Sequence, residues 1–368
     1  MTKPETIILY IGTYTRHEDF VDGKGKGIYV YRFNPTSGAL TYEATVAGAG
    51  TVNPSFLIPA PDRGCLYAVN EITGGKGPHG TVSAFAIDPE TKGLTFLNQQ
   101  STHGLAPCYV SVDPSGRYAL VANYETGSVC VLPLALNGQL EEATDVVQFH
   151  GSGPNPDRQE GPHAHMIFPG PDGRFIFAVD LGSDRIMVYR LDPEQGKLVP
   201  AEPAWTRLFP GTGPRHLVFN PQKQFAYVVS ELQSTVTVFQ YDEQNGSLHE
   251  RQTISTLPED FNGQNLGAEI QVAPSGRFVY ASNRGHDSIV TYAVDELTGD
   301  LSVVSHEPTQ GVGPRYFTID PSGNWLLAAN QDSDTVVTFR IDQISGKLKP
   351  TEQIVEVPTP VCLQLYSS

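Results

Sequence analysis

The chain has 368 residues, with 36 glycines, 29 prolines and a formal net charge of −16 at pH 7. This acidity argues against a general nucleic-acid-binding surface, which needs clustered lysine and arginine. An anionic small molecule would instead need a local arginine cluster that opposes the charge of the rest of the protein.

The N-terminal stretch MTKPETIILYIGTYT contains an apolar run that is too short for a signal peptide or a membrane helix. We therefore expect a cytoplasmic protein that does not bind membranes. Further along the chain, β-branched and aromatic residues recur in short segments such as YALVAN and YVVSE, and no segment keeps a helical apolar period. These features predict an all-β protein with many turns.

A repeated unit follows, and its turns are the easiest part to align. The turns APDRG, DPSGR, GPDGR, NPQKQ, APSGR and DPSGN each carry a proline, and the ninth residue after that proline is short and polar. These polar residues are Asn70, Asn123, Asp180, Ser230, Asn283 and Asn330. Each unit then ends on a turn with glycine and leucine, as in SGAL, TKGL, NGQL, QGKL, NGSL, TGDL and SGKL.

The sequence contains seven glycine–leucine turns that end a unit, but only six proline turns followed by the short polar residue. One unit is therefore divided between the two ends of the chain. The C-terminal VPTPVCLQLY supplies the missing first strand, and the N-terminal IILYIGTYT supplies the strand that follows it. Units of roughly fifty residues with about four short strands are typical of β-propeller blades. We predict one domain over residues 1–368, an all-β seven-bladed β-propeller closed by pairing of the N- and C-terminal strands.

Positions around one mouth of the channel carry the candidate functional residues. In a propeller blade the first strand lines the channel and the second returns beside it, so the start of the first strand meets the end of the second at the face opposite the Pro-Ser-Gly turn. A small ligand can bind at such a mouth. In the early blades, the first strands start with uncharged residues. The later blades bring charged and polar residues to the mouth: His163, His165, Asp180, Arg215, His216, Glu231, Glu269, Asn283, Arg284, Arg315 and Gln331.

Structural roles compete with functional ones at some of these positions. Asp180 and Asn283 could cap strand ends by binding the backbone. The motif DLGSDR is better explained by a salt bridge between Asp184 and Arg185 than by catalysis.

Cysteine and histidine give little indication of a metal site. The four cysteines are scattered, without a C-x-x-C pair, and we expect buried, small apolar side chains at Cys65, Cys108 and Cys130 in particular. The HAH motif places His163 and His165 on one face of a strand, which makes a metal site geometrically feasible. Because the neighbouring candidates are arginines, which repel a cation, we expect neither metal nor cofactor.

Several motifs resemble the seven-bladed lactonase family over essentially the whole chain: YIGTYT, GPHAH with DLGSDR, GPRHLVFNP with SEL, and SNRGHDSI with GVGPRYF. That family includes bacterial 6-phosphogluconolactonases and fungal carboxy-cis,cis-muconate cyclases. In the muconate branch of the family, one histidine, two arginines and one glutamate at the channel mouth form the proposed active site. The resemblance implies that these roles fall on His163 (or His165), Arg215, Glu231 and Arg284. The motif NLGAEI departs from the family pattern, since it brings Glu269 to the mouth in place of Pro-Arg or Pro-His.

We therefore expect a lactone hydrolase that acts on a small anionic sugar lactone, 6-phosphoglucono-δ-lactone of the pentose phosphate pathway. Glu231 or His163 would activate water, and Arg215 would stabilise the oxyanion. Arg284 and Arg315 would grip a phosphate or carboxylate. The remaining expected substrate-binding residues are His165, Asp180, His216, Glu269, Asn283 and Gln331. Two alternatives stay open: a muconate-type lactonizing cycloisomerase, and a propeller without catalysis that serves as an interaction platform.

Overall fold

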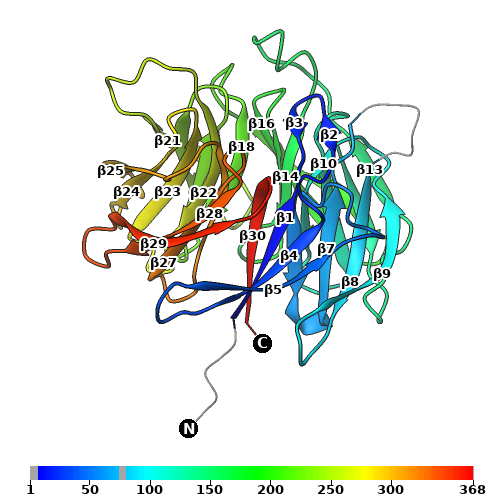
Figure 1. Cartoon of the computed structure of the whole chain (residues 1–368). Helices are drawn as coiled ribbons and strands as arrows, with labels where there is room; N and C mark the ends of the chain where they lie inside the picture. Colours follow the sequence, from blue (N-terminus) through cyan, green and yellow to red (C-terminus); the bar gives the residue numbers. More distant parts are fainter. Residues whose placement is uncertain (1–6, 74–79, 368) are drawn as a thin grey trace.

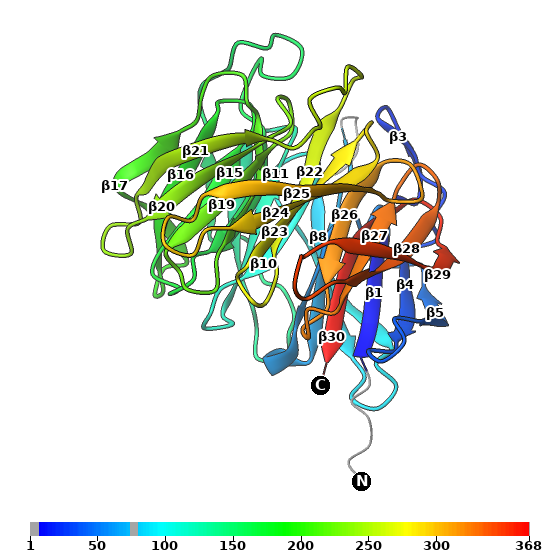
Figure 2. The same ribbon diagram turned by 90° about the vertical axis from the view of Figure 1, so that its left-hand side faces the viewer.

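The computed structural model describes residues 7–73 and 80–367. Within this part of the chain, seven four-stranded antiparallel sheets surround a central channel, and Figures 1 and 2 show them as the blades of a propeller. The predicted seven-bladed β-propeller is therefore confirmed.

Blades 1 to 3 follow one another along the chain. Blade 1 contains β6 (Leu57–Ala60), β7 (Cys65–Asn70), β8 (Thr81–Ile87) and β9 (Leu94–Ser101), with the 3-10 turn η1 (Pro61–Arg63) between β6 and β7. Blade 2 contains β10 (Pro107–Val112), β11 (Tyr118–Asn123), β12 (Ser128–Pro133) and β13 (Asp145–Gln148). Blade 3 contains β14 (Ala164–Pro169), β15 (Ile176–Asp180), β16 (Arg185–Asp192) and β17 (Lys197–Arg207).

Blades 4 to 6 repeat the same order, and blade 7 combines both ends of the chain. Blade 4 contains β18 (Pro214–Phe219), β19 (Phe225–Ser230), β20 (Thr235–Tyr241) and β21 (Leu248–Ser255). Blade 5 contains β22 (Leu266–Val272), β23 (Phe278–Arg284), β24 (Ser288–Val294) and β25 (Leu301–Pro308). Blade 6 contains β26 (Pro314–Ile319), β27 (Trp325–Asn330), β28 (Thr335–Ile341) and β29 (Leu348–Glu356). Blade 7 contains β30 (Pro360–Ser367), β1 (Ile7–Thr13), β4 (Ile28–Phe33) and β5 (Leu40–Val46).

The first strand of each blade lies innermost, next to the channel. These strands, β6, β10, β14, β18, β22, β26 and β30, contact their neighbours in an unbroken ring. The second strands β7, β11, β19 and β27 are buried along their whole length, since both of their faces pack against neighbouring blades. For this reason their sequences are continuous apolar runs rather than alternating patterns.

Pairing between the two ends of the chain closes the ring, as predicted. Strand β30 pairs antiparallel with β1, from Ile7 opposite Ser367 to Thr13 opposite Pro360. Strand β1 in turn pairs with β4, so blade 7 has the order β30-β1-β4-β5. Both ends of the described chain are therefore held within one sheet.

The repeated Asp-Pro-Ser-Gly turn joins the first and second strands through a carboxylate. In blade 6, Asp320 Oδ1 accepts a hydrogen bond of 2.7 Å from the backbone N–H of Trp325, and Oδ2 accepts one of 2.5 Å from the Ser322 hydroxyl. Gly323 has φ +71°, a left-handed conformation that glycine adopts without steric cost. The repeated turn is thus architectural, and it leaves the opposite ends of the strands for other roles.

One element at the candidate mouth was not predicted from the sequence. A short hairpin, β2 (His17–Glu18) and β3 (Val21–Asp22), is inserted between β1 and β4. It lies at the end of the propeller away from the two ends of the described chain (Figure 1). Glu18 Oε1 accepts a hydrogen bond of 2.9 Å from the Asn53 amide, which ties the hairpin to the chain entering blade 1.

The cysteines agree with the expectation from the sequence. All four, Cys65, Cys108, Cys130 and Cys362, are buried, and none forms a disulfide. In the described residues no helix is long and apolar enough to cross a membrane.

Deleting residues 360–368 should destabilise the whole propeller rather than trim a tail. The deletion removes β30, with the buried side chains of Val361, Cys362 and Leu363, and leaves β1 with an open edge. At about 1.5–3 kcal/mol for each buried apolar side chain, we expect the free energy of unfolding to fall by roughly 5 kcal/mol or more. Thermal unfolding followed by circular dichroism measures this change, and an unaltered melting temperature would contradict the closure.

Candidate functional site

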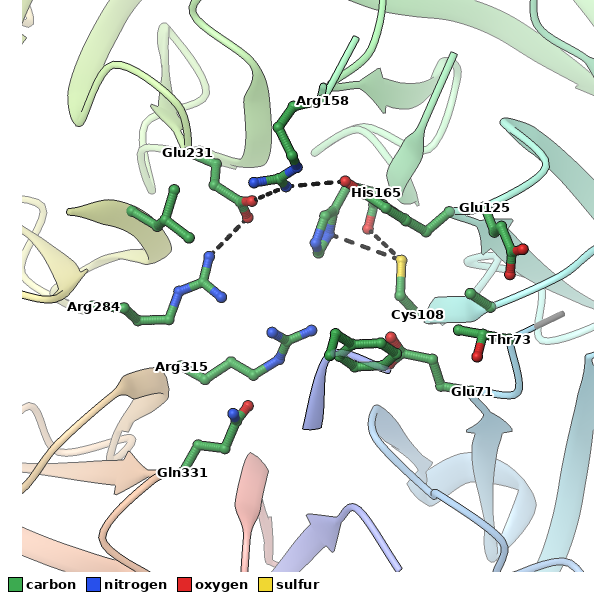
Figure 3. Close-up of a pocket in the computed structure, with 14 residues that line it drawn as sticks. Glu71, Thr73, Cys108, Glu125, Arg158, His165, Glu231, Arg284, Arg315 and Gln331 are labelled. Atoms are coloured by element: carbon green, nitrogen blue, oxygen red, sulfur yellow. Dashed lines mark hydrogen bonds and ion pairs between the residues drawn. The ribbon is translucent and has the colours of Figure 1, made fainter. Parts of the chain in front are cut away.

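A cavity of about 460 Å³ opens at the mouth predicted from the sequence, opposite the Asp-Pro-Ser-Gly turns. Its walls come from several blades, from the β2–β3 hairpin and from the loop before β14 (Figure 3). The lining residues are Phe20, Glu71, Thr73, Ala106, Cys108, Tyr124, Glu125, Arg158, His165, Glu231, Leu266, Arg284, Arg315 and Gln331.

A β-bulge at the start of the first strand directs side chains toward the channel. In blades 2, 3, 4 and 6 the register with the second strand shifts directly after the first pair of residues. The residues skipped by the ladder are Cys108, His165, Arg215 and Arg315. A bulged residue is unpaired and its side chain is re-aimed. The Gly-Pro-Arg motif therefore encodes a strand start followed by a bulged residue that is turned toward the channel.

The register decides between the two histidines of the HAH motif. Ala164 pairs with Asp180 as Pro214 pairs with Ser230, so His165, rather than His163, is equivalent to Arg215. His165 lines the cavity. Burial, with Arg215 and Arg315 nearby, lowers the pKa of His165 well below its usual value, which keeps the imidazole neutral.

His163 does not line the cavity, and both of its ring nitrogens have partners. Nδ1 is 3.0 Å from the Tyr124 carbonyl oxygen, and Nε2 is 3.2 Å from Glu160 Oε1. The imidazole also stacks on the Tyr124 ring at a centroid distance of 4.6 Å. His163 is therefore placed to support Tyr124 rather than to face the cavity.

Glu231 is the centre of an arginine cluster. Its Oε1 lies 2.5 Å from Arg158 Nη2, and its Oε2 lies 2.8 Å from Arg284 Nη2 and 3.2 Å from Arg215 Nε. Burial alone would raise the pKa of Glu231, but Arg284, Arg215 and Arg158 outweigh it and hold the pKa at about 2. The carboxylate is thus permanently ionised and fixes the positions of three guanidinium groups.

Arg158 belongs to this cluster and was missed in the sequence. It comes from the connection between β13 and β14, residues 149–163, which is longer than the other blade-to-blade connections. Besides Glu231, its Nη2 donates a hydrogen bond of 3.1 Å to the Tyr124 hydroxyl. The extra length of this loop, on the face of the predicted mouth, was the signal that could have identified it.

The expected salt bridge between Asp184 and Arg185 is wrong. Asp184 Oδ1 instead accepts hydrogen bonds from the Gln159 amide at 2.9 Å and from the Gly213 backbone N–H at 2.8 Å. Arg185 lies over the Trp205 ring, with 4.8 Å between Cζ and the ring centroid. Asp184 lies in the turn before β16, with φ +57°, and its hydrogen bond to Gln159 anchors the loop that carries Arg158.

Arg215 and Arg315 share a position in their blades but differ in their surroundings. Arg215 lies behind the cavity wall, where Nη1 donates a hydrogen bond of 2.7 Å to the Ala268 carbonyl oxygen. Arg315 lines the cavity, with its Cζ 5.6 Å from the Tyr14 ring centroid, and it makes no ion pair with the described residues. Gln331 also lines the cavity, beside Arg315 in Figure 3.

The structure places His216 and Glu269 deeper in the channel than the sequence predicted. His216 Nδ1 lies 2.6 Å from Glu269 Oε2, and burial raises the pKa of Glu269 while Arg215 opposes the rise. Both residues line a second cavity of about 320 Å³, between aromatic rings that include Phe56 and Tyr109. Arg215 separates this cavity from the one at the mouth, since it contacts both Glu231 and His216 Nε2, the latter at 3.4 Å.

Asp180 and Asn283 hold strand ends together and do not line the cavity at the mouth. Asp180 Oδ1 accepts hydrogen bonds from the backbone N–H groups of His163 at 2.6 Å and Gly182 at 3.1 Å. The Asn283 amide donates to the Thr256 carbonyl oxygen at 2.8 Å and accepts from the Thr256 hydroxyl at 2.7 Å. These contacts match the capping role that the sequence left open for both residues.

Comparison with known proteins agrees with this architecture. The chain matches the family model "Lactonase, 7-bladed beta-propeller" over residues 8–365. It is 36% identical to the 6-phosphogluconolactonase of Bacillus subtilis (strain 168) over 364 residues, which are 99% of each chain.

Solved structures give the same result. The periplasmic gluconolactonase PpgL of Pseudomonas aeruginosa is 38% identical, with a TM-score of 0.90 over 98% of this chain and 99% of that one. A protein of Bacteroides fragilis is 36% identical, with a TM-score of 0.91 over 100% of this chain and 99% of that one. The chain therefore belongs to the seven-bladed β-propeller lactonase family.

Proposed function

We propose that this protein hydrolyses a sugar lactone that carries an anionic group, with 6-phosphoglucono-δ-lactone as the substrate. The observation that supports this most directly is the convergence of Arg158, Arg284 and Arg315 on one cavity (Figure 3). Arg315 faces that cavity without an ion-pair partner in the described part of the chain. A volume of about 460 Å³ is in the range of small-molecule sites. The activity named for the Bacillus subtilis relative is consistent with this assignment.

Arg315 and Arg284 have distinct tasks in the proposed reaction. Arg315 binds the phosphate of the substrate, since a planar guanidinium matches two phosphate oxygens at once. Arg284, whose Nη2 is held by Glu231, presents its other N–H groups toward the cavity and stabilises the oxyanion that forms on the lactone carbonyl. Arg284 does not have to move during the reaction, because its ion pair with Glu231 holds it in place.

We assign Glu231 to positioning, although the sequence suggested it as the base. Its oxygens already contact three guanidinium groups, and a carboxylate with a pKa of about 2 is a weak proton acceptor at neutral pH. Arg215 likewise acts through Glu231, since it lies behind the cavity wall.

A hydrolysis assay with a small panel of lactones tests the function. We expect turnover of 6-phosphoglucono-δ-lactone above its spontaneous rate, weaker turnover of the unphosphorylated glucono-δ-lactone, and no cyclisation of 3-carboxy-cis,cis-muconate. Cyclisation of the muconate without lactone hydrolysis would favour the cycloisomerase, and inactivity on the whole panel would contradict the proposal.

We also propose a cytoplasmic location, because the charges of a phosphorylated substrate prevent it from crossing a lipid bilayer unaided. Cell fractionation followed by immunoblotting tests the location. Recovery of the protein in the periplasmic fraction would contradict it.

Replacing Arg315 by lysine should mainly raise KM. The charge stays, but the second hydrogen bond to the phosphate is lost, which is worth about 1.5–3 kcal/mol and corresponds to a roughly 10- to 150-fold higher KM. Steady-state kinetics on the phosphorylated lactone measures this. The exposed Arg32, which pairs with Glu43 on the outside of blade 7, provides the matched control Arg32→Lys with unchanged kinetics.

Replacing Arg215 by lysine should lower both kcat and stability. Lysine fills the buried position with one donor group and cannot reach Glu231, Ala268 and His216 together. We expect the loss of buried hydrogen bonds to cost about 1–3 kcal/mol of unfolding free energy. Kinetics and thermal unfolding of the same preparation measure both effects, and normal values of both would show that Arg215 does not position Glu231.

Hydrolysis should survive exhaustive chelation. No three histidine, cysteine, aspartate or glutamate side chains of the described residues are grouped as a metal site would require. His165 is surrounded by arginine charge, which repels a cation. We expect activity after dialysis against EDTA to stay within about twofold of the untreated enzyme, and recovery of a lost activity by a divalent ion would overturn this expectation.

A further inference from the structure

Glu71 and Glu231 occupy the same position in two different blades. Each follows the buried polar residue that ends a second strand: Asn70 at the end of β7 and Ser230 at the end of β19. Both line the cavity, and Figure 3 shows them on different sides of it. Because the two carboxylates share their place in the repeat, any difference in what they do comes from their neighbours.

The neighbours of Glu71 leave it as a usable proton acceptor. Its Oε2 accepts a hydrogen bond of 2.8 Å from the Tyr14 hydroxyl, and Tyr14 is fully buried at the end of β1. No arginine forms an ion pair with Glu71 in the described structure, in contrast to the three that hold Glu231. When the surroundings of two carboxylates in one site push their pKa values in opposite directions, one usually serves as a fixed charge and the other exchanges protons.

The backbone of Glu71 is held firmly in place. Its N–H donates a hydrogen bond of 3.0 Å to the Asn53 carbonyl oxygen, and the Asn53 amide donates one of 3.0 Å back to the Glu71 carbonyl oxygen. The same Asn53 amide bonds Glu18 of the β2–β3 hairpin. The side chain therefore projects into the cavity from a rigid support, as an acid–base group requires.

We propose that Glu71 takes a proton from the attacking water and returns it to the ring oxygen of the lactone, with Tyr14 as the residue that positions its carboxylate. This proposal rests on the lactone hydrolysis proposed above. In the first step the water oxygen bonds to the carbonyl carbon, a proton passes to Glu71, and the carbonyl electron pair moves onto oxygen. In the second step the carbonyl re-forms, the bond from carbon to the ring oxygen breaks, and Glu71 returns its proton to that oxygen, which yields the hydroxy acid.

The charged and titratable groups that face Glu71 come from several elements and set its protonation. They are Tyr14 after β1, Cys108 on β10, Arg215 on β18 and Arg315 on β26. Burial raises the pKa of Glu71 above that of an ordinary glutamate, and Arg315 opposes the rise. Since only the ionised form accepts a proton, hydrolysis should decline as the pH falls through this raised pKa.

His165 is the rival for the same role, because it also lines the cavity. Its Nδ1 lies 3.9 Å from Cys108 Sγ, and its lowered pKa makes it a weak base. The decline of kcat/KM at low pH is the acid limb of the pH profile. If Glu71 is the base, replacing Tyr14, which contacts Glu71, should shift this acid limb. If His165 is the base, the same replacement should leave the acid limb unchanged.

The test compares pH profiles of kcat/KM for the wild type and the variants Glu71→Gln, Tyr14→Phe and His165→Asn. We expect Glu71→Gln to lower kcat about 100-fold or more and to abolish the acid limb. Tyr14→Phe should shift the acid limb to higher pH and keep most of the plateau rate, since the tyrosine hydroxyl stabilises the ionised carboxylate. The exposed Glu352 on β29 provides the matched control Glu352→Gln, with an unchanged profile.

Each outcome decides the proposal. A Glu71→Gln enzyme that keeps its rate and its acid limb overturns it, as does loss of the acid limb in His165→Asn alone. If Glu71→Gln does not fold, Tyr14→Phe decides, and an unshifted acid limb contradicts the proposal. Absence of lactone hydrolysis in the wild type contradicts both this role and the proposed function, whereas hydrolysis with a normal Glu71→Gln contradicts this role alone.

Discussion

The antiparallel pairing of β30 with β1 is the constraint on which the rest of the structure depends. It completes the ring of first strands, and the ring fixes where every strand start lies relative to the channel. The cavity at the mouth exists because strand ends from blades 1 to 6 converge there, none of which supplies more than a few of its residues. Stability and chemistry are therefore coupled through one sheet that contributes little to the cavity itself.

Within that frame, two local devices convert a repeated blade into a site. The bulge after the first residue of β10, β14, β18 and β26 turns one side chain per blade toward the channel. In blade 4, the residue after the end of the second strand meets this side chain, since Glu231 contacts Arg215. The repeat thus supplies the positions, and the side chain chosen in each blade supplies the chemistry.

The sequence predicted the fold well because blade signals are local. Backbone geometry determines the turn residues, the nine-residue spacing from the turn proline to the polar residue, and the continuous apolar runs. The same signals also identified which strand ends lie at the mouth. Side-chain roles depended on contacts across blades, which spacing does not reveal. Arg158 was missed because a loop brings it to Glu231, and His165 was not distinguished from His163 because a bulge shifts the register by one residue. Glu71 directly follows Asn70, a position of the repeat, but its importance depends on Tyr14, which lies 57 positions away in the chain.

The adjacency of Ile7 and Ser367 in blade 7 has a consequence for how this architecture tolerates rearrangement. Since the two ends of the described chain lie side by side on one sheet, the starting point of the polypeptide is topologically arbitrary. A short linker between the ends, with a new opening in an outer loop of another blade, would give a circularly permuted chain with the same spatial order of blades. The arginine–glutamate cluster would be preserved in such a chain, because its geometry depends on neighbours around the ring and not on the order of synthesis.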